Sequence, residues 1–237
     1  MTPRDREIVR WIGRHRMVTA GQVAEQFEIG RSQCYARLTG LVRLGLLVHE
    51  RLLHGEPGVY RALRSGLDSA GLALPPASID LRTYLHDLQL TSLVTELERA
   101  ARAGARVWTE RELRAIDTPG GRAPERYEPR FAALLGRGGQ LRLTPAGSPR
   151  VHFPDAVIED PIDGISAIEL ELTAKGRSRV RAILQAYVAA RHISRVRYYV
   201  CDPRVGELLQ GEITRLRAGD VVSLCPWDSE QPSARAA

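Results

Sequence analysis

Three short helical patterns followed by a hairpin, all within the first 63 residues, constrain the fold of this chain more than any other feature. A stripe of apolar residues predicts a first helix over Asp5–His15. Thr19 precedes a predicted second helix over Ala20–Phe27, and Gln22 completes a capping-box pattern at its start. A break at Gly30 follows, so we expect a tight turn between the second and third helices.

The third helix is predicted to begin at the capping residue Ser32 and to end at Gly45. Two short strands follow, Leu46–Leu53 and Val59–Leu63, and the loop between them contains two glycines and a proline, as a turn would. The order of helix, helix, turn, helix and hairpin is that of a winged helix-turn-helix. We therefore predict a DNA-binding domain of this kind over residues 1–76.

In a helix-turn-helix, residues near the N-terminus of the third helix reach base edges in the major groove. Glutamine can pair with adenine there, and arginine with guanine or a phosphate. The plainer interpretation is a solvated polar face that binds a protein, but 11 arginines against seven acids in residues 1–76 favour DNA. The predicted DNA-binding residues are Arg31, Ser32, Gln33, Tyr35 and Arg37, with Arg51, His54 and Arg61 in the wing.

The segment Ala73–Ser78, which contains two prolines, is the predicted linker to a second domain over residues 79–227. This domain is expected to open with a long helix over about Asp80–Ala103, followed by a strand at Arg106–Thr109. Residues 228–237 have the composition of a disordered tail. The residues expected to form the buried stripe of the long helix are Leu81, Leu85, Leu88, Leu93, Val94 and Leu97.

Two strongly apolar strands, Val151–Ile158 and Ile165–Leu172, are joined by a short turn and carry three acids. Strand alternation puts Glu169 and Glu171 on one face, and Asp155 joins them if it lies opposite Glu169. Three carboxylates on adjacent strands repel one another, and Mg²⁺ or Mn²⁺ is the natural counter-cation for such oxygen ligands. We predict a metal site at Asp155 and Glu169; the alternative is an edge strand with a solvated acidic face.

After this hairpin the pattern predicts a helix over Arg177–Arg191, a strand over Arg195–Cys201, a helix over Gly206–Leu216 and a strand over Val221–Leu224. The first of these helices is strongly basic. Its arginines are a predicted secondary DNA contact, with a solvated helix face as the alternative. The residues concerned are Arg177, Arg179 and Arg181.

The order of a winged helix, a long helix, the Pro154-Asp155 hairpin, the Glu169-x-Glu171 strand and a basic helix resembles the replication-relaxation family of bacterial plasmids and mobile elements. The resemblance covers about residues 4–225. It implies an α+β fold class, with an N-terminal winged helix-turn-helix followed by an α/β domain similar to the PD-(D/E)XK nucleases. It also implies catalytic roles for residues of the hairpin. The residues are Asp155, Glu169, Glu171 and Lys175.

One position departs from the nuclease pattern, which has lysine two residues after the acid, where this chain has Glu171. Lys175 is the single lysine among 34 basic residues, and its side chain is expected to turn back and supply the missing charge. Because the lysine position is lost, we expect the nuclease-like domain to cleave DNA weakly or not at all.

No apolar run is long enough to span a bilayer, and the first residues lack the pattern of a secretory signal, so we expect a cytoplasmic protein without a membrane partner. The leading prediction is a protein that binds double-stranded DNA in the control of plasmid or mobile-element replication or of transcription. The first alternative is a Mg-dependent endonuclease. The second is a transcriptional regulator whose C-terminal domain only forms a homodimer or senses a ligand.

Overall fold

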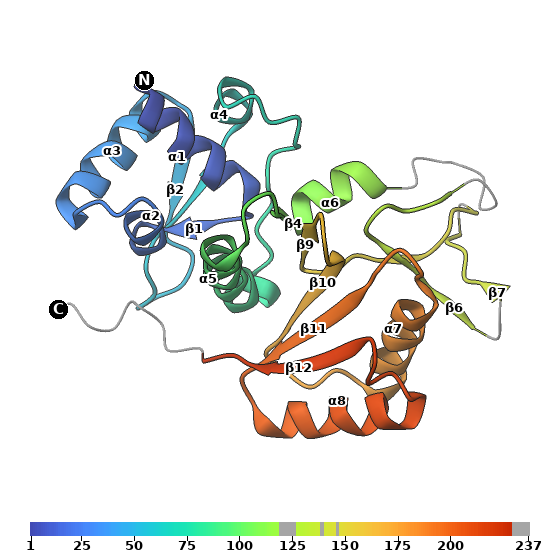
Figure 1. The fold of residues 1–237 in the computed structure, drawn as a ribbon. Coiled ribbons are helices and arrows are strands. Elements are labelled where there is room, and N and C mark those ends of the chain that lie inside the picture. The colour runs from blue at the N-terminus through green and yellow to red at the C-terminus, as the bar shows by residue number, and fades with distance from the viewer. Residues whose placement is uncertain (119–126, 138–139, 146, 229–237) are drawn as a thin grey trace. The chain divides into compact units, whose positions relative to one another are not determined.

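The computed structural model describes residues 1–118, 127–137, 140–145 and 147–228, which form a mixed α+β protein (Figure 1). The predicted tail at 228–237 lies outside the described residues except for its first residue. The described residues divide into two compact units, unit 1 (Met1–Leu97) and unit 2 (Glu98 to Asp228), which are described separately. None of the helices in these ranges has the length and apolar character that crossing a membrane would require.

Unit 1 contains six helices and one three-stranded antiparallel sheet, in the strand order β1-β3-β2. The predicted helices and the hairpin are present with ends shifted by a few residues. A two-residue strand and a six-residue helix were not predicted, because both are too short to carry a periodic pattern. The elements are α1 (Pro3–Arg14), β1 (Val18–Thr19), α2 (Ala20–Gln26), α3 (Arg31–Arg43), β2 (Leu47–Glu50), β3 (Val59–Ala62), α4 (Arg64–Ser69), the 3₁₀ turn η1 (Leu81–Thr83) and α5 (Tyr84–Ala100).

The start of α3 differs from the prediction. The N-cap is Gly30, which has extended backbone angles and no side-chain cap, so Ser32 lies inside the first turn instead of capping it. The predicted end is confirmed, because Gly45 follows the helix with φ of +68°. The capping box of Thr19 and Gln22 at the start of α2 is also present.

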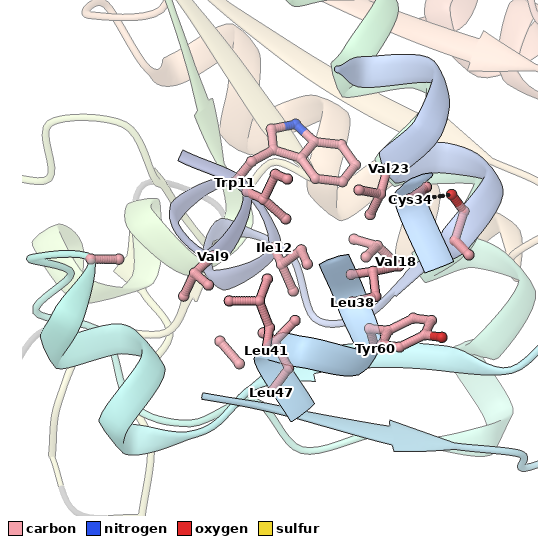
Figure 2. Packing of buried hydrophobic residues seen from close by; sticks show 14 of the residues in the cluster. Val9, Trp11, Ile12, Val18, Val23, Cys34, Leu38, Leu41, Leu47 and Tyr60 are labelled. Atoms are coloured by element: carbon pink, nitrogen blue, oxygen red, sulfur yellow. Dashed lines mark hydrogen bonds between the residues drawn. The ribbon is translucent and has the colours of Figure 1, made fainter. Parts of the chain in front are cut away.

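One apolar cluster holds the helices of unit 1 on the sheet (Figure 2). Ile12 of α1, Leu38 of α3 and Val18 of β1 are fully buried within it. Cys34, on the inner side of α3, donates its thiol to the Ala20 carbonyl at 3.3 Å, and burial raises the pKa of this thiol to about 11. The cysteine is therefore a packing residue, and its position fixes which side of α3 faces outward.

Helix α5 packs on unit 1, although it was predicted to open the second domain. Tyr84 and Leu88 are buried against Met17 and Val59, and the Gln22 side chain donates to the Leu88 carbonyl at 2.8 Å. The compact unit consequently extends past the predicted linker. The predicted stripe is wrong at its start: Leu81 and Leu85 are 56% and 52% exposed, while Tyr84 and Thr91 are buried in their place.

Unit 2 is built on a five-stranded sheet with the order β12-β11-β10-β9-β4 (Figure 1). Strand β9 runs antiparallel to both of its neighbours, β4 and β10, while β10, β11 and β12 are parallel and are joined by helices. The elements are β4 (Arg106–Thr109), α6 (Glu110–Asp117), β5 (Ala133–Leu134), β6 (Gly136–Arg137), β7 (Gln140–Leu141), β8 (Val151–His152), β9 (Ala156–Asp160), β10 (Gly164–Glu171), α7 (Arg177–Ala189), β11 (Arg195–Val200), α8 (Pro203–Leu216) and β12 (Val222–Pro226).

The predicted strand Val151–Ile158 is two strands, β8 and β9, which belong to different sheets. They separate at Phe153-Pro154-Asp155, since proline has no N–H to donate to a ladder. Strand β10 lies in the middle of the large sheet and its residues from Ser166 to Glu171 are buried. The alternative of an edge strand with a solvated acidic face is therefore wrong.

Helices α7 and α8 cover one face of the sheet of unit 2. Ala167, Val196 and Val222 contribute to the cluster from three neighbouring strands, with Leu184 of α7 and Leu209 of α8 packed over them. By alternation, the acids of β10 lie on the same face as Ala167. They are enclosed by the principal core of unit 2, which strand alternation alone did not predict.

Candidate nucleic-acid interface and buried carboxylate site

The outward side of α3 is cationic and exposed. The helix carries three arginines and no acidic residue, and its inner side is anchored by Cys34, Leu38 and Leu41. Four of the five predicted DNA-reading residues on this helix are exposed, with Tyr35 at 46%. They are Arg31, Ser32, Gln33 and Tyr35.

Arg37, the fifth of these predicted residues, forms an ion pair with Asp5 of helix α1. Its Nη1 lies 2.7 Å from Oδ1 of Asp5, whose other oxygen accepts the Thr2 N–H in the capping box of α1. Burial alone would raise the pKa of Asp5, but the hydrogen bonds from Thr2 and Arg37 lower it below its usual value. The predicted contact of Arg37 with a base or a phosphate therefore competes with this ion pair.

In the predicted wing, Arg51 and His54 are exposed, which is compatible with the predicted contact with a DNA backbone. Arg61 is engaged within unit 1: its Nε and Nη2 lie 2.6 and 3.3 Å from the two oxygens of Glu50, and its Nη1 donates to the Ala77 carbonyl. The hydrogen bonds from Arg61 lower the pKa of Glu50. Arg61 thus joins β2 to β3 and to the segment after α4, which local sequence could not show.

A hollow of about 400 Å³ lies along α3 on the side of α1. Ala36 and Gly40, which were not predicted as site residues, line this hollow together with Gln33. Thr39 and Arg43 are exposed on the same helix. Thr39 and Arg43 could have been predicted from the helical period of 3.6 residues, which places them on the outward side of α3. The lining residues are Asp5, Gln33, Ala36, Arg37, Gly40, Leu41 and Leu44.

The carboxylates of unit 2 meet where β9 begins. The backbone N–H of Asp155 donates to the Ile168 carbonyl, and its Oδ2 accepts the Leu170 N–H at 2.8 Å. Because Ile168 pairs with Ala156, the register carried one step further places Asp155 opposite Glu169, the position the hairpin predicted. Burial raises the pKa of Glu171, and the charges of Glu169 and Asp155 add to this rise, so the three acids share one environment.

Glu169 is held by two aromatic side chains. Its Oε1 accepts from the Tyr187 hydroxyl of α7 and lies 2.7 Å from Nε2 of His152. Tyr198 is its partner on β11. Burial, reinforced by the charge of Glu169, raises the pKa of both tyrosines well above the usual range, so both hydroxyls stay protonated.

Lys175 turns back onto Glu171, with 2.6 Å between Nζ and Oε2. Burial raises the pKa of Glu171 despite the attraction of the lysine. Burial alone would lower the pKa of Lys175, but the charges of Glu169 and Glu171 raise it. The ammonium group of Lys175 is therefore a counter-cation for Glu171. The prediction that this side chain turns back toward the site is confirmed.

Groups of the protein already occupy part of the oxygen set that a Mg²⁺ or Mn²⁺ ion would use. One oxygen of each acid is committed: Glu169 to Tyr187 and His152, Glu171 to Lys175, and Asp155 to a backbone N–H. Across the described ranges, no three His, Cys, Asp or Glu side chains are grouped to hold a metal. His152, Tyr187 and Tyr198 were not predicted as site residues, because only the packing of β8, α7 and β11 brings them to Glu169.

The predicted DNA-contacting arginines of the basic helix α7 differ in their exposure and in their partners. Arg177 and Arg179 are exposed, in keeping with a surface that can meet a polyanion. Arg181 instead places Nε and Nη2 at 2.9 and 3.1 Å from the two oxygens of Glu212 on α8. This bidentate pair joins the two helices, so Arg181 is less available than Arg177 and Arg179 for the predicted secondary DNA contact.

Comparisons with models of protein families, with curated proteins and with solved structures found no match to this chain. The resemblance to the replication-relaxation family stays a prediction that rests on the motifs and their order.

Proposed function

We propose that this protein binds double-stranded DNA through a winged helix-turn-helix formed by unit 1, with α3 as the helix that enters the major groove. The observation that carries the proposal is the outward side of α3, which presents exposed arginines and hydrogen-bonding side chains and no acid. The hairpin of β2 and β3 would serve as the wing, with Arg51 and His54 beside the backbone.

Unit 2 is proposed to be a PD-(D/E)XK-like domain that supports DNA binding without efficient cleavage. The order of elements supports the fold: Asp155 directly before β9, two acids on the neighbouring β10, then the basic helix α7 and the parallel strand β11. The internal partners of the carboxylates support weak or absent cleavage, because each acid already accepts from a donor of the protein or pairs with Lys175. By the resemblance, such a protein would act in plasmid or mobile-element replication or in transcription control, and the sequence pattern favours the cytoplasm.

A Mg-dependent endonuclease is the second candidate. It is favoured by the shared environment of Asp155, Glu169, Glu171 and Lys175, a combination of acids and ammonium typical of phosphodiester chemistry. Supercoiled plasmid incubated with the protein and Mg²⁺ or Mn²⁺ decides between the two. Nicking that Glu169→Gln abolishes would establish the endonuclease, and intact plasmid supports the binding protein.

Binding of the full chain to a labelled duplex, measured by fluorescence anisotropy over a range of salt concentrations, tests the leading proposal. The double variant Arg31→Glu, Arg43→Glu is expected to weaken binding at least tenfold and to lower the salt slope by about two, because each arginine lost removes about one phosphate contact. The matched control, Arg177→Glu with Arg179→Glu on α7, changes the net charge equally and is expected to weaken binding less. A larger loss in the control would contradict the assignment to α3.

A further inference from the structure

Three residues in line along α3 form an unusual surface for a cationic helix. Gln33, Ala36 and Gly40 are spaced by three and four residues, so they follow one another along one side of the helix. Gln33 and Ala36 are exposed. A Cβ built at Gly40 meets nothing within 4 Å. The line therefore offers an amide, a methyl group and then bare backbone.

This line forms part of the wall of the hollow along α3, which is open and about 400 Å³ in volume. On its other side Arg37 is held by Asp5, with 2.7 Å between Nη1 and Oδ1. The Gln33 amide makes no side-chain hydrogen bond to the described part of the chain, so both its donor and its acceptor remain available. Gln33, and not Arg37, is thus the polar group ready to bind a ligand here.

We propose that this surface reads an A·T base pair in the major groove: the Gln33 amide pairs with adenine, and the Ala36 methyl contacts a thymine methyl. Glutamine matches the N6 donor and N7 acceptor of adenine, and alanine is an apolar partner for the thymine 5-methyl group. Gly40 leaves room for α3 to approach the bases closely. Arg37 is a positioning residue that ties α3 to α1. The inference rests on the proposed function and names the base pair that unit 1 selects.

Selection of binding sites by the full chain from a random duplex library tests this. The wild type is expected to select a site with an A·T pair whose replacement by G·C weakens binding by between about fivefold and 150-fold. Gln33→Ala should abolish that discrimination while retaining salt-dependent binding. Gln33→Arg should shift the preference at this position to G·C, because arginine pairs with guanine. Gln210→Arg, an exposed glutamine on α8, adds the same charge elsewhere and should leave the preference unchanged.

The thymine contact has its own test. Replacing the thymine of the selected pair by uracil removes the 5-methyl group, which should weaken wild-type binding a few fold and have no effect on Ala36→Gly. The circular dichroism melting curve of each variant establishes that it is folded.

The outcomes separate the inference from the proposed function. A wild type that binds no duplex overturns both. A wild type that binds duplex without selecting a sequence, or whose base preference survives Gln33→Ala and Gln33→Arg, overturns the A·T inference alone. A preference changed by Arg37→Ala but by neither Gln33 variant would transfer base reading to Arg37 and also overturn it.

Discussion

The outer side of α3 in unit 1 and the carboxylate site in unit 2 are both dense in charge, but they use it in opposite ways. On α3 the arginines outnumber the acids and most of the polar groups are exposed. Around β10 the acids are 2% and 4% exposed and are matched inside the protein by Lys175, Tyr187 and His152. A surface of the first kind attracts an external polyanion, whereas a network of the second kind stabilises its own fold.

This difference shows why residue type alone does not identify a functional site. Glu169 and Glu171 follow a catalytic pattern in sequence, yet packing gives each an internal partner. Arg37 and Arg61 follow a DNA-binding pattern, yet each has an acid within 3 Å. The partners available after folding decide whether a charge acts on a ligand or on the protein.

The largest effect is expected from breaking the ion pair of unit 2. Lys175→Met leaves the buried Glu171 without its cation, and should lower the free energy of unfolding by about 3 kcal/mol. The double variant Lys175→Met, Glu171→Gln removes both charges and should recover most of that loss. Urea denaturation at pH 7 measures both. Equal stability of the wild type and the single variant would show that the pair is not part of the network.

Two glycines of unit 1 distinguish its packed side from its open side. A Cβ at Gly66 in α4 would lie 2.2 Å from the Leu46 carbonyl oxygen, so Gly66→Ala should destabilise the protein by about 2.5 kcal/mol. Gly40→Ala on α3 meets open space and should stabilise it by about 0.5–1 kcal/mol, since alanine favours a helix. Thermal unfolding of the pair checks the difference, and a destabilising Gly40→Ala would refute the open surface.

Tyr187→Phe removes one hydrogen bond to Glu169 with almost no change of shape. Because the carboxylate stays buried, we expect a loss of about 2 kcal/mol in the free energy of unfolding. Tyr199→Phe, on the neighbouring β11, is a control with partial exposure and should change stability less. An unchanged Tyr187→Phe protein would mean that the hydroxyl is not needed to satisfy Glu169.

The smallest effect concerns Asp5, and its sign depends on pH. Its pKa is lowered in the folded protein, so it stabilises the fold at pH 7, and this contribution is lost as the pH falls through the folded-state pKa, below the usual 3.8. Asp5→Asn should therefore cost about 1 kcal/mol at pH 7 and less at low pH. Because it also removes a negative charge beside α3 and frees Arg37, the same variant should bind duplex DNA more tightly.

Local patterns predicted most of the fold. The capping box at Thr19, the stop at Gly45 and the strand Arg106–Thr109 are all present, because short-range backbone preferences determine them. The buried side of α5 was not predictable, because it depends on Met17 and Val59, which are distant in sequence. The break at Pro154 within an apolar run was readable in principle, since proline interrupts a central strand.

The sites were predictable to a similar extent. The helix that carries the exposed arginines and the position of Asp155 opposite Glu169 follow from periodicity and register. The pairs Arg37–Asp5 and Arg61–Glu50, and the approach of Tyr187 to Glu169, join segments that come together only when helices and strands pack. No local pattern contains that information. Which charged side chains have a partner inside the protein is therefore known only from the three-dimensional structure.

Hydrogen–deuterium exchange of the full chain, with and without a saturating duplex, tests whether α3 binds DNA. We expect slower exchange in α3 (Arg31–Arg43) and in the loop between β2 and β3 when DNA is bound. Exchange in β9 and β10, around the buried carboxylates, should stay unchanged. Protection confined to β9, β10 and α7, with none in α3, would show that unit 1 does not bind the duplex and would make the carboxylate site the DNA-binding surface.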